Sequence, residues 1–235
     1  MINDKSILAI ILARGGSKRL PDKNILPLNQ KPLILWSIQA GLNSEYVDRV
    51  LVSSNDNNIL NISRKGGAEI IKRPEELSTD HSASIFAVKH AISEIGDKFD
   101  YTILLQPTSP LRTERHINEA FELLMEKNAD AIISVCKTKH NPLWSNTLPD
   151  DDSMNHFIKD KIKNTRSQDL PVYYSLNGAI YICKTQRLMI EETFFISDKI
   201  YAYKMNDIDS IDIDNELDYS FADYIINNAS ENYND

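Results

Sequence analysis

Residues 9–24 read Ala9-Ile-Ile-Leu-Ala-Arg-Gly-Gly-Ser-Lys-Arg-Leu-Pro-Asp-Lys-Asn24, and they join an apolar run to a basic loop. The apolar run, from Ile7 to Ala13, has the length of a buried strand and is too short to span a membrane. Gly15 and Gly16 follow it and allow the backbone to turn sharply and to approach a ligand closely. Ligands of open α/β sheets bind outside the carboxyl ends of the strands, so this loop is a candidate binding site.

Four cationic side chains crowd this loop, Arg14, Lys18, Arg19 and Lys23, although the chain carries a net charge of −8. Because like charges repel, such a cluster is unfavourable unless an anion shares it, and a polyphosphate is the natural candidate. The alternative is an ordinary solvated turn. The loop matches neither the Walker A pattern nor Gly-x-Gly-x-x-Gly. The sequence therefore predicts nucleotide binding by a different loop chemistry.

Length and composition indicate one globular domain over residues 1–235, because 42% of the residues are hydrophobic, enough for a core. The excess of acidic residues argues against nucleic-acid binding, which needs a broad basic face. A polar start at Asn3 and Asp4 precedes only a short apolar run, so we expect no signal peptide, no membrane segment and a cytoplasmic location. Cys136 and Cys183 lie in apolar runs and are expected to be buried free thiols.

Hydrophobic periodicity predicts strands that alternate with helices along the chain. The predicted strands are 7–13, 49–53, 69–72, 101–105, 131–136, 178–183 and 200–205. The predicted helices are 33–42, 59–63, 84–95, 114–127 and 215–226. This alternation predicts an α/β fold with a mostly parallel, doubly wound sheet that has helices on both faces. The tail after Asn227 is expected to be frayed.

Residues 137–173 break this pattern. The segment contains Pro142, Pro149 and Pro171, an Asp triplet at 150–152 and little periodicity. A loop of this length without secondary structure is unusual inside a compact domain. Two interpretations are open, an inserted arm that packs on another subunit and a lid over the site, and the arm is favoured.

A second polar stretch, residues 210–218, carries Asp212 and Asp214 two positions apart. In an extended segment both carboxylates point to the same side, where they repel each other unless a divalent cation binds. Carboxylate and phosphate oxygens are typical ligands of magnesium. The alternative is an acidic strand end that caps the following helix, a role that Asp214 alone could fill. The carboxylate pair and the basic loop together suit phosphoryl or nucleotidyl transfer.

Six motifs that follow one another from about residue 7 to residue 226 resemble the bacterial N-acylneuraminate cytidylyltransferases. They are Ala13-Arg14-Gly15-Gly16-Ser17-Lys18, Lys23-Asn24, Arg73-Pro74, Leu105-Gln106-Pro107-Thr108-Ser109-Pro110-Leu111-Arg112, Asn177-Gly178-Ala179-Ile180-Tyr181 and Asp212-Ile213-Asp214. The resemblance implies a nucleotide-diphosphosugar-transferase-like fold and a homodimer. It also implies Mg²⁺-dependent transfer of CMP from CTP to the anomeric 2-hydroxyl of a nonulosonic acid, with release of pyrophosphate.

The resemblance also implies roles for individual residues. The expected CTP-binding residues are Arg14, Ser17, Lys18, Lys23, Asn24, Arg73 and Ser84, of which the last can also cap its helix. The expected sugar-acid ligands are Gln106, Arg166, Asn177 and Tyr181, with Arg166 near or across the dimer interface. The expected metal ligands are Asp212 and Asp214, and the expected catalytic groups are Arg14, Lys18, Lys23 and Asp212. Asp212 is the candidate for the base that takes the hydroxyl proton.

The identity of the sugar stays open at this point. Arg19 follows Lys18 where many sialate enzymes carry Gly and where relatives that activate pseudaminic acid often carry Arg. N-acetylneuraminate is the first choice, and legionaminic and pseudaminic acids are the alternatives. More remote alternatives are a cytidylyltransferase for the eight-carbon sugar Kdo, a glycosyltransferase that consumes nucleotide-sugars through Asp-x-Asp, and a catalytically silent nucleotide-sensing module.

Overall fold

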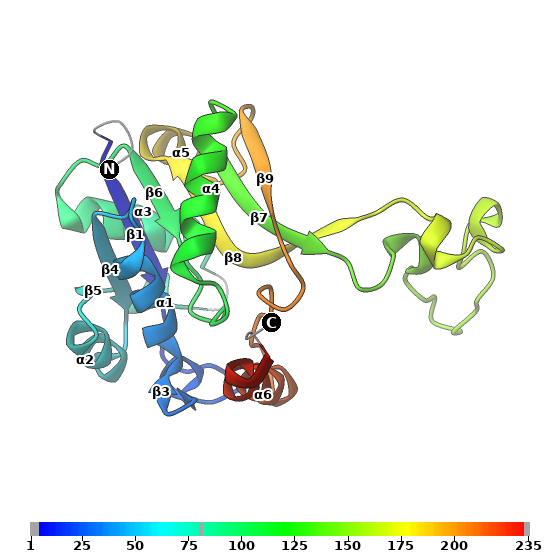
Figure 1. The fold of residues 1–235 in the computed structure, drawn as a ribbon, viewed down its shortest axis with the longest axis horizontal. Coiled ribbons are helices and arrows are strands. Elements are labelled where there is room, and N and C mark those ends of the chain that lie inside the picture. Colours follow the sequence, from blue (N-terminus) through cyan, green and yellow to red (C-terminus); the bar gives the residue numbers. More distant parts are fainter. Residues whose placement is uncertain (1–4, 80–81, 233–235) are drawn as a thin grey trace.

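The computed structural model describes residues 5–79 and 82–232, and a sheet of seven strands forms its centre (Figure 1). The strand order is β5-β4-β1-β6-β8-β7-β9. The strands are β1 (Ile7–Leu12), β4 (Arg49–Ser54), β5 (Glu69–Lys72), β6 (Tyr101–Leu104), β7 (Ala131–Lys137), β8 (Tyr174–Lys184) and β9 (Ile200–Met205). Strand β8 is antiparallel to its neighbours β6 and β7, and the other neighbouring strands are parallel. The prediction of a mostly parallel sheet is confirmed.

Helices cover both faces of the sheet. They are α1 (Leu33–Asn43), α2 (Asn57–Lys65), α3 (Ser84–Ile95), α4 (Glu114–Glu126), α5 (Thr185–Glu191) and α6 (Glu216–Asn232). Ile7, Ala9 and Ile11 of β1 pack into one core with side chains of α1, α2 and α4. The alternate residues Leu8 and Ile10 pack into a second core with side chains of α3 and α5. None of the helices in residues 5–79 and 82–232 is long and apolar enough to cross a membrane.

The structure adds elements to the predicted ones and lengthens one of them. Helix α5 and a short hairpin of β2 (Pro27–Leu28) and β3 (Lys31–Pro32) had no predicted counterpart. Helix α6 continues to Asn232, so it is longer than the predicted helix, which ended at residue 226. The last part of the predicted tail, residues 233–235, lies outside the described residues.

A small third core fixes the second polar stretch. Ile211 and Ile213 are buried together with Leu28 of the hairpin and Ala222 of α6. Asp212, which lies between the two isoleucines, is exposed. The alternation predicted for this extended segment is therefore present, and it keeps the carboxylates on the side opposite the core.

Segment 137–173 leaves the end of β7 and returns into β8. It contains three single-turn 3₁₀ helices, Pro142–Trp144, Asp160–Ile162 and Ser167–Asp169. In Figure 1 the segment projects to the right, away from the rest of the chain. The predicted break in the α/β pattern thus corresponds to a long connection that projects from the end of the neighbouring strands β7 and β8.

Candidate functional site

The basic loop after β1 folds against the end of β4. The backbone N–H of Gly15 donates to Asn55 Oδ1 at 3.0 Å, and Ala13 N–H donates to the Ser53 carbonyl at 3.1 Å. A Cβ added at Gly15 would lie 3.1 Å from the side chain of Asp56, so the glycine lets the loop approach the start of α2 closely. The approach brings the loop to the carboxyl end of the parallel strands, where the sequence placed the binding site.

The side chain of Asn24 forms a hydrogen bond across the basic loop. Its Nδ2 donates to the carbonyl of Arg14 at 3.0 Å, and only 7% of the residue is exposed. Its Oδ1 is buried without a hydrogen-bond partner among the described residues. A buried carbonyl oxygen without a partner is costly, so this atom is suited to accept a hydrogen bond from a ligand.

Three cavities that share lining residues run along this edge of the sheet. The central cavity measures about 500 Å³ and lies between the basic loop and the strand end at Gln106. A second cavity of about 450 Å³ begins at the same Gln106 and reaches Tyr181. A third cavity of about 320 Å³ shares Arg14 and Ser84 with the central one and reaches Arg73. Together the three form one elongated site.

All of the predicted site residues except Arg166 line this elongated site. The residues that do so are Arg14, Ser17, Lys18, Lys23, Asn24, Arg73, Ser84, Gln106, Asn177, Tyr181, Asp212 and Asp214. Arg166 lies in segment 137–173, where 75% of its side chain is exposed and its Nε donates to Asp169 Oδ2 at 2.9 Å. Within one chain, Arg166 therefore lines none of the three cavities.

Asp214 stands between two cations of the basic loop. Lys23 Nζ lies 3.2 Å from its Oδ1, and Arg19 Nη1 lies 3.1 Å from its Oδ2. Lys23 Nζ also donates to the carbonyl of Ile213 at 2.6 Å, and only 12% of the lysine side chain is exposed. The two stretches that the sequence singled out separately thus meet directly.

The helix-capping alternative for Asp214 does not hold. Asn215 caps α6, since its Oδ1 accepts from the N–H groups of Leu217 at 2.9 Å and Asp218 at 3.1 Å. Asp218 Oδ2 in turn accepts from the N–H groups of Asp214 at 3.0 Å and Asn215 at 3.1 Å. The side-chain carboxylates of Asp212 and Asp214 are therefore not used to cap α6. In the same way Ala83 is the N-cap of α3, so Ser84 does not cap that helix.

The pKa of the Asp212 carboxylate is shifted by its surroundings. Its pKa is raised above the usual value, first because surrounding protein atoms displace water from the carboxylate, and also because Asp214 is negatively charged. A hydrogen bond with Thr108 opposes this shift. A carboxylate whose pKa moves toward the working pH is a more effective general base.

The pair could hold a divalent cation only together with ligands from outside the chain. Among residues 5–79 and 82–232 there is no group of three or more His, Cys, Asp and Glu side chains that could hold a metal ion. Asp214 lines the basic central cavity and Asp212 lines the adjoining second cavity, so the pair lies where the two cavities meet. Two carboxylates beside basic residues fit the chemistry of Mg²⁺, which usually keeps several waters and binds substrate phosphates. Asp212 and Asp214 are the residues that would bind it.

Gln106 separates the central cavity from the second one. Its carbonyl accepts from Ser37 Oγ at 3.0 Å and from Arg112 Nη2 at 3.3 Å. Arg112 is 1% exposed, and burial lowers its pKa to about 9. The side chain of Gln106 lies against Gly178, which has a φ of +75°. The anchoring role of Arg112 was not predicted, because nothing near it in sequence identifies its partners.

The side-chain amide of Asn177 makes hydrogen bonds within the protein through both its nitrogen and its oxygen. Its Nδ2 donates to Ser210 Oγ at 2.9 Å and lies 3.3 Å from the sulfur of Met205. Its Oδ1 accepts from Ser134 Oγ at 2.6 Å and from Ala179 N–H at 3.3 Å. Asn177 borders the second cavity, yet its amide chiefly joins β8 to the polar stretch after β9.

Two aromatic residues at the site were not predicted. Tyr181 packs against Phe194 and Phe195 with ring centroids 5.8 Å and 6.4 Å apart. Both phenylalanines line a fourth cavity of about 290 Å³ that also touches Gln106. They follow α5, which had no predicted counterpart, so no pattern pointed to them. Burial, and then the charge of Asp212, raises the pKa of Tyr181.

Comparisons with known proteins identify a family and a shared fold. Residues 8–229 match a family model described as cytidylyltransferase. The N-acylneuraminate cytidylyltransferase of Escherichia coli is 37% identical over 217 residues, which are 92% of this chain and 51% of that protein. The CMP-N,N'-diacetyllegionaminic acid synthase of Legionella pneumophila is 35% identical over 231 residues, 94% of this chain and 96% of that protein.

The chain spans about half the length of the N-acylneuraminate cytidylyltransferases that it matches among bacteria. A solved structure of CMP:2-keto-3-deoxy-manno-octonic acid synthetase complexed with CTP superposes with a TM-score of 0.72. That match covers 95% of this chain and 99% of the other at 16% identity, so it shows a shared fold.

Proposed function

The chain belongs to the cytidylyltransferase family, and we propose that it transfers CMP from CTP to the anomeric 2-hydroxyl of a nonulosonic acid, N-acetylneuraminate being the first choice. The observation that carries this proposal is the elongated site, in which a basic central cavity joins two flanking cavities. Such a site has room for a nucleoside, a triphosphate and a second substrate in a row. The L. pneumophila relative supports legionaminic acid as the alternative acceptor.

CTP fits the third and central cavities. Arg14, Ser17 and Lys18 line the central cavity, where cationic and hydroxyl groups suit the triphosphate. Arg73 is 5% exposed, and its pKa is lowered chiefly by burial and then by the charge of Arg14. A buried guanidinium that faces a second cation favours a ligand rich in hydrogen-bond acceptors, such as the cytosine ring and the phosphates. Asn24 Oδ1 would accept from a donor of the nucleoside.

Asp212 and Asp214 would hold Mg²⁺ together with the phosphate oxygens of CTP. When bound, the ion offsets the negative charge of the phosphates and orients them for in-line displacement. Lys23 and Arg19, which flank Asp214, would stabilise the charge on the departing pyrophosphate.

The acceptor fits the second cavity, beyond Gln106. Its 2-hydroxyl oxygen forms a bond to the α-phosphorus of CTP, and the bond from that phosphorus to the pyrophosphate oxygen breaks. Asp212, which borders this cavity and has a raised pKa, accepts the hydroxyl proton. The neutral amide of Gln106 can bind sugar hydroxyls without adding charge next to the phosphates.

We also propose that the protein is a homodimer and that segment 137–173 packs on a second copy. Leu148, Met154 and Val172 in this segment are between 53% and 61% exposed, and contact with a partner would bury them. Such packing would also explain Arg166, which would act near or across the interface. Sedimentation of the intact chain is expected to give the mass of a dimer, and a monomeric mass would contradict this proposal. A cytoplasmic location remains a prediction.

The experiment that tests the function is pyrophosphate release from CTP and Mg²⁺ with N-acetylneuraminic, legionaminic or pseudaminic acid as acceptor. We expect release that depends on one of the three acids. The glycosyltransferase alternative predicts release of free nucleotide from a CMP-sugar without pyrophosphate, and the sensing alternative predicts CTP binding without any turnover.

A further inference from the structure

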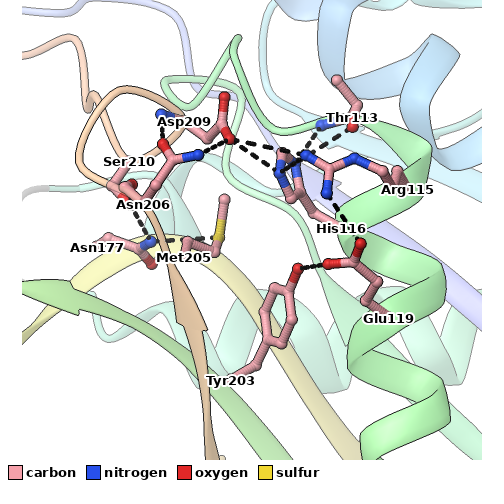
Figure 2. Close-up of polar contacts among 10 residues, drawn as sticks. All are labelled: Thr113, Arg115, His116, Glu119, Asn177, Tyr203, Met205, Asn206, Asp209 and Ser210. Carbon is pink, nitrogen blue, oxygen red and sulfur yellow. Dashed lines mark hydrogen bonds and ion pairs between the residues drawn. The ribbon is translucent and has the colours of Figure 1, made fainter.

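A polar cluster around the buried ring of His116 holds the polar stretch that carries the two carboxylates. Figure 2 shows this cluster, in which Asp209 points toward His116 and Arg115 at the start of α4. We propose that His116 and Asp209 form a positioning pair that fixes residues 206–214 in the geometry needed for metal binding. The inference rests on the proposed function, because the metal is the one expected for the transfer of CMP.

Asp209 closes a tight turn at the start of this stretch. Its N–H donates to Asn206 Oδ1 at 2.8 Å, and its Oδ2 accepts from Asn206 Nδ2 at 2.6 Å. Ser210 Oγ adds a bond to the carbonyl of Asn206 at 2.6 Å. These hydrogen bonds hold the turn in one conformation and couple its backbone to the side chain of Asp209.

His116 anchors this turn to α4. The residue is 3% exposed, and its Nε2 lies 3.0 Å from Asp209 Oδ2. The N–H of Thr113 donates to His116 Nδ1 at 3.1 Å, so Nδ1 acts as an acceptor and carries no proton. The proton of the neutral ring is consequently on Nε2, from which it is donated to Asp209. Arg115 Nη2 lies 3.9 Å from the same carboxylate oxygen and 3.0 Å from His116 Nε2, so its positive charge offsets that of the carboxylate and disfavours a second proton on the ring.

The anchored turn leads directly into the carboxylate pair. Ser210, the residue after Asp209, accepts from Asn177 Nδ2 at 2.9 Å, and Ile211 is 9% exposed. No freely moving residue therefore separates the anchor from Asp212. A change of the His116–Asp209 bond is transmitted to Asp212 through a short chain that is fixed at each step. Partners that orient metal ligands in this way affect metal affinity by about 10- to 100-fold.

A purely structural cluster would predict a different result, and Glu119 provides the matched control. Glu119 belongs to the same cluster and bonds to Tyr203 and Arg115. Its substitution removes a carboxylate at a comparable position in the cluster but leaves the bond between His116 and Asp209 in place. Glu119→Gln is therefore expected to change the melting temperature without changing metal binding.

The test measures Mn²⁺ affinity of the intact protein in the presence of saturating CTP, from the electron paramagnetic resonance signal of free Mn²⁺. Asp209→Ala is expected to weaken Mn²⁺ binding at least about tenfold, while CTP affinity without metal changes by less than about twofold. Asp209→Asn keeps an oxygen that accepts from His116 and is expected to recover most of this affinity. Glu119→Gln should match the wild type.

Unchanged Mn²⁺ affinity in folded Asp209→Ala, or an equal loss in Glu119→Gln, would overturn the proposal. If Asp209→Ala does not fold, Asn206→Ala replaces it, since it releases the same turn from an exposed position, and the same two outcomes decide. The proposed function is judged separately by wild-type pyrophosphate release. Wild-type turnover with unaffected Mn²⁺ binding in the variants refutes the positioning pair alone. Absence of turnover with the expected metal loss refutes the function alone.

Discussion

Replacing Gly178 by alanine is expected to displace the side chain of Gln106, which separates the two proposed substrate sites. An added Cβ would lie 2.5 Å from Gln106 Oε1, well inside contact distance, and 3.4 Å from Nε2. The backbone of Gln106 is fixed, because its carbonyl accepts from Ser37 and from the buried Arg112. The side chain of Gln106 must therefore rotate away, and it leaves the position from which it would bind the sugar acid.

Two costs follow from this substitution. A φ of +75° is unfavourable for alanine, which lowers the free energy of unfolding by roughly 1–2 kcal/mol. Loss of one hydrogen bond from Gln106 to the acceptor removes about 1 kcal/mol of binding, which corresponds to a KM for the sugar acid about five- to tenfold higher. The KM for CTP is expected to change less, because Gly178 lines the second cavity and neither of the two cavities assigned to CTP.

The assay is steady-state pyrophosphate release with each substrate varied in turn, together with urea unfolding. Gly96→Ala is the control, because Gly96 has a φ of +71° and no atom lies within 4 Å of an added Cβ. Gly96→Ala should show the same loss of stability and wild-type kinetics. A Gly178→Ala enzyme with an unchanged KM for the sugar acid would refute the assignment of Gln106 to the acceptor.

Three further predictions concern single groups. Asp214→Asn is expected to lower kcat at least about 100-fold by weakening the hold on the metal, and near-normal pyrophosphate release would contradict that role. Burial is the largest effect on His116 and lowers its pKa below 6.5. On acidification the unfolded chain therefore binds a proton at this histidine before the folded chain does. The free energy of unfolding consequently falls as the pH drops below about 6.5. Urea unfolding at pH 7.5 and 5.5 should show this decline, and His116→Gln should reduce it. An equal decline in the variant would show that another group causes the loss of stability. Burial raises the pKa of the Cys183 thiol to about 12, so only the partly exposed Cys136 should react with a thiol reagent before unfolding, and two fast thiols would be inconsistent with this core.

The sequence predicted those parts of the fold whose signal is local. The apolar run at 7–13 followed by Gly15 and Gly16 identifies a buried strand and a close backbone approach without reference to any distant residue. The alternation of isoleucine and aspartate at 211–214 similarly predicts one buried face and one exposed face, and the structure has both. In each case the side chains that make the pattern also make the contact.

Features that depend on distant partners could not be read in the same way. The direction of β8 is set by pairing with β6 and β7 after a long excursion of the chain, and no local pattern encodes it. Asn177 was predicted to bind the sugar acid, and no local pattern indicated that its amide also bonds to Ser134 and Ser210, which lie 43 and 33 positions away. His116 meets Asp209 only because α4 packs beside the end of β9.

The central claim is that the acceptor's 2-hydroxyl oxygen attacks the α-phosphorus of CTP. The most direct test uses an acceptor labelled with ¹⁸O at that hydroxyl and follows the reaction with CTP and Mg²⁺ by ³¹P nuclear magnetic resonance. The account predicts that pyrophosphate appears and that the label stays in the bridge between sugar and phosphorus, visible as an isotope shift of the CMP-sugar signal. A CMP-sugar without the label in its bridge, or CTP that remains unchanged with every nonulosonic acid, would contradict it.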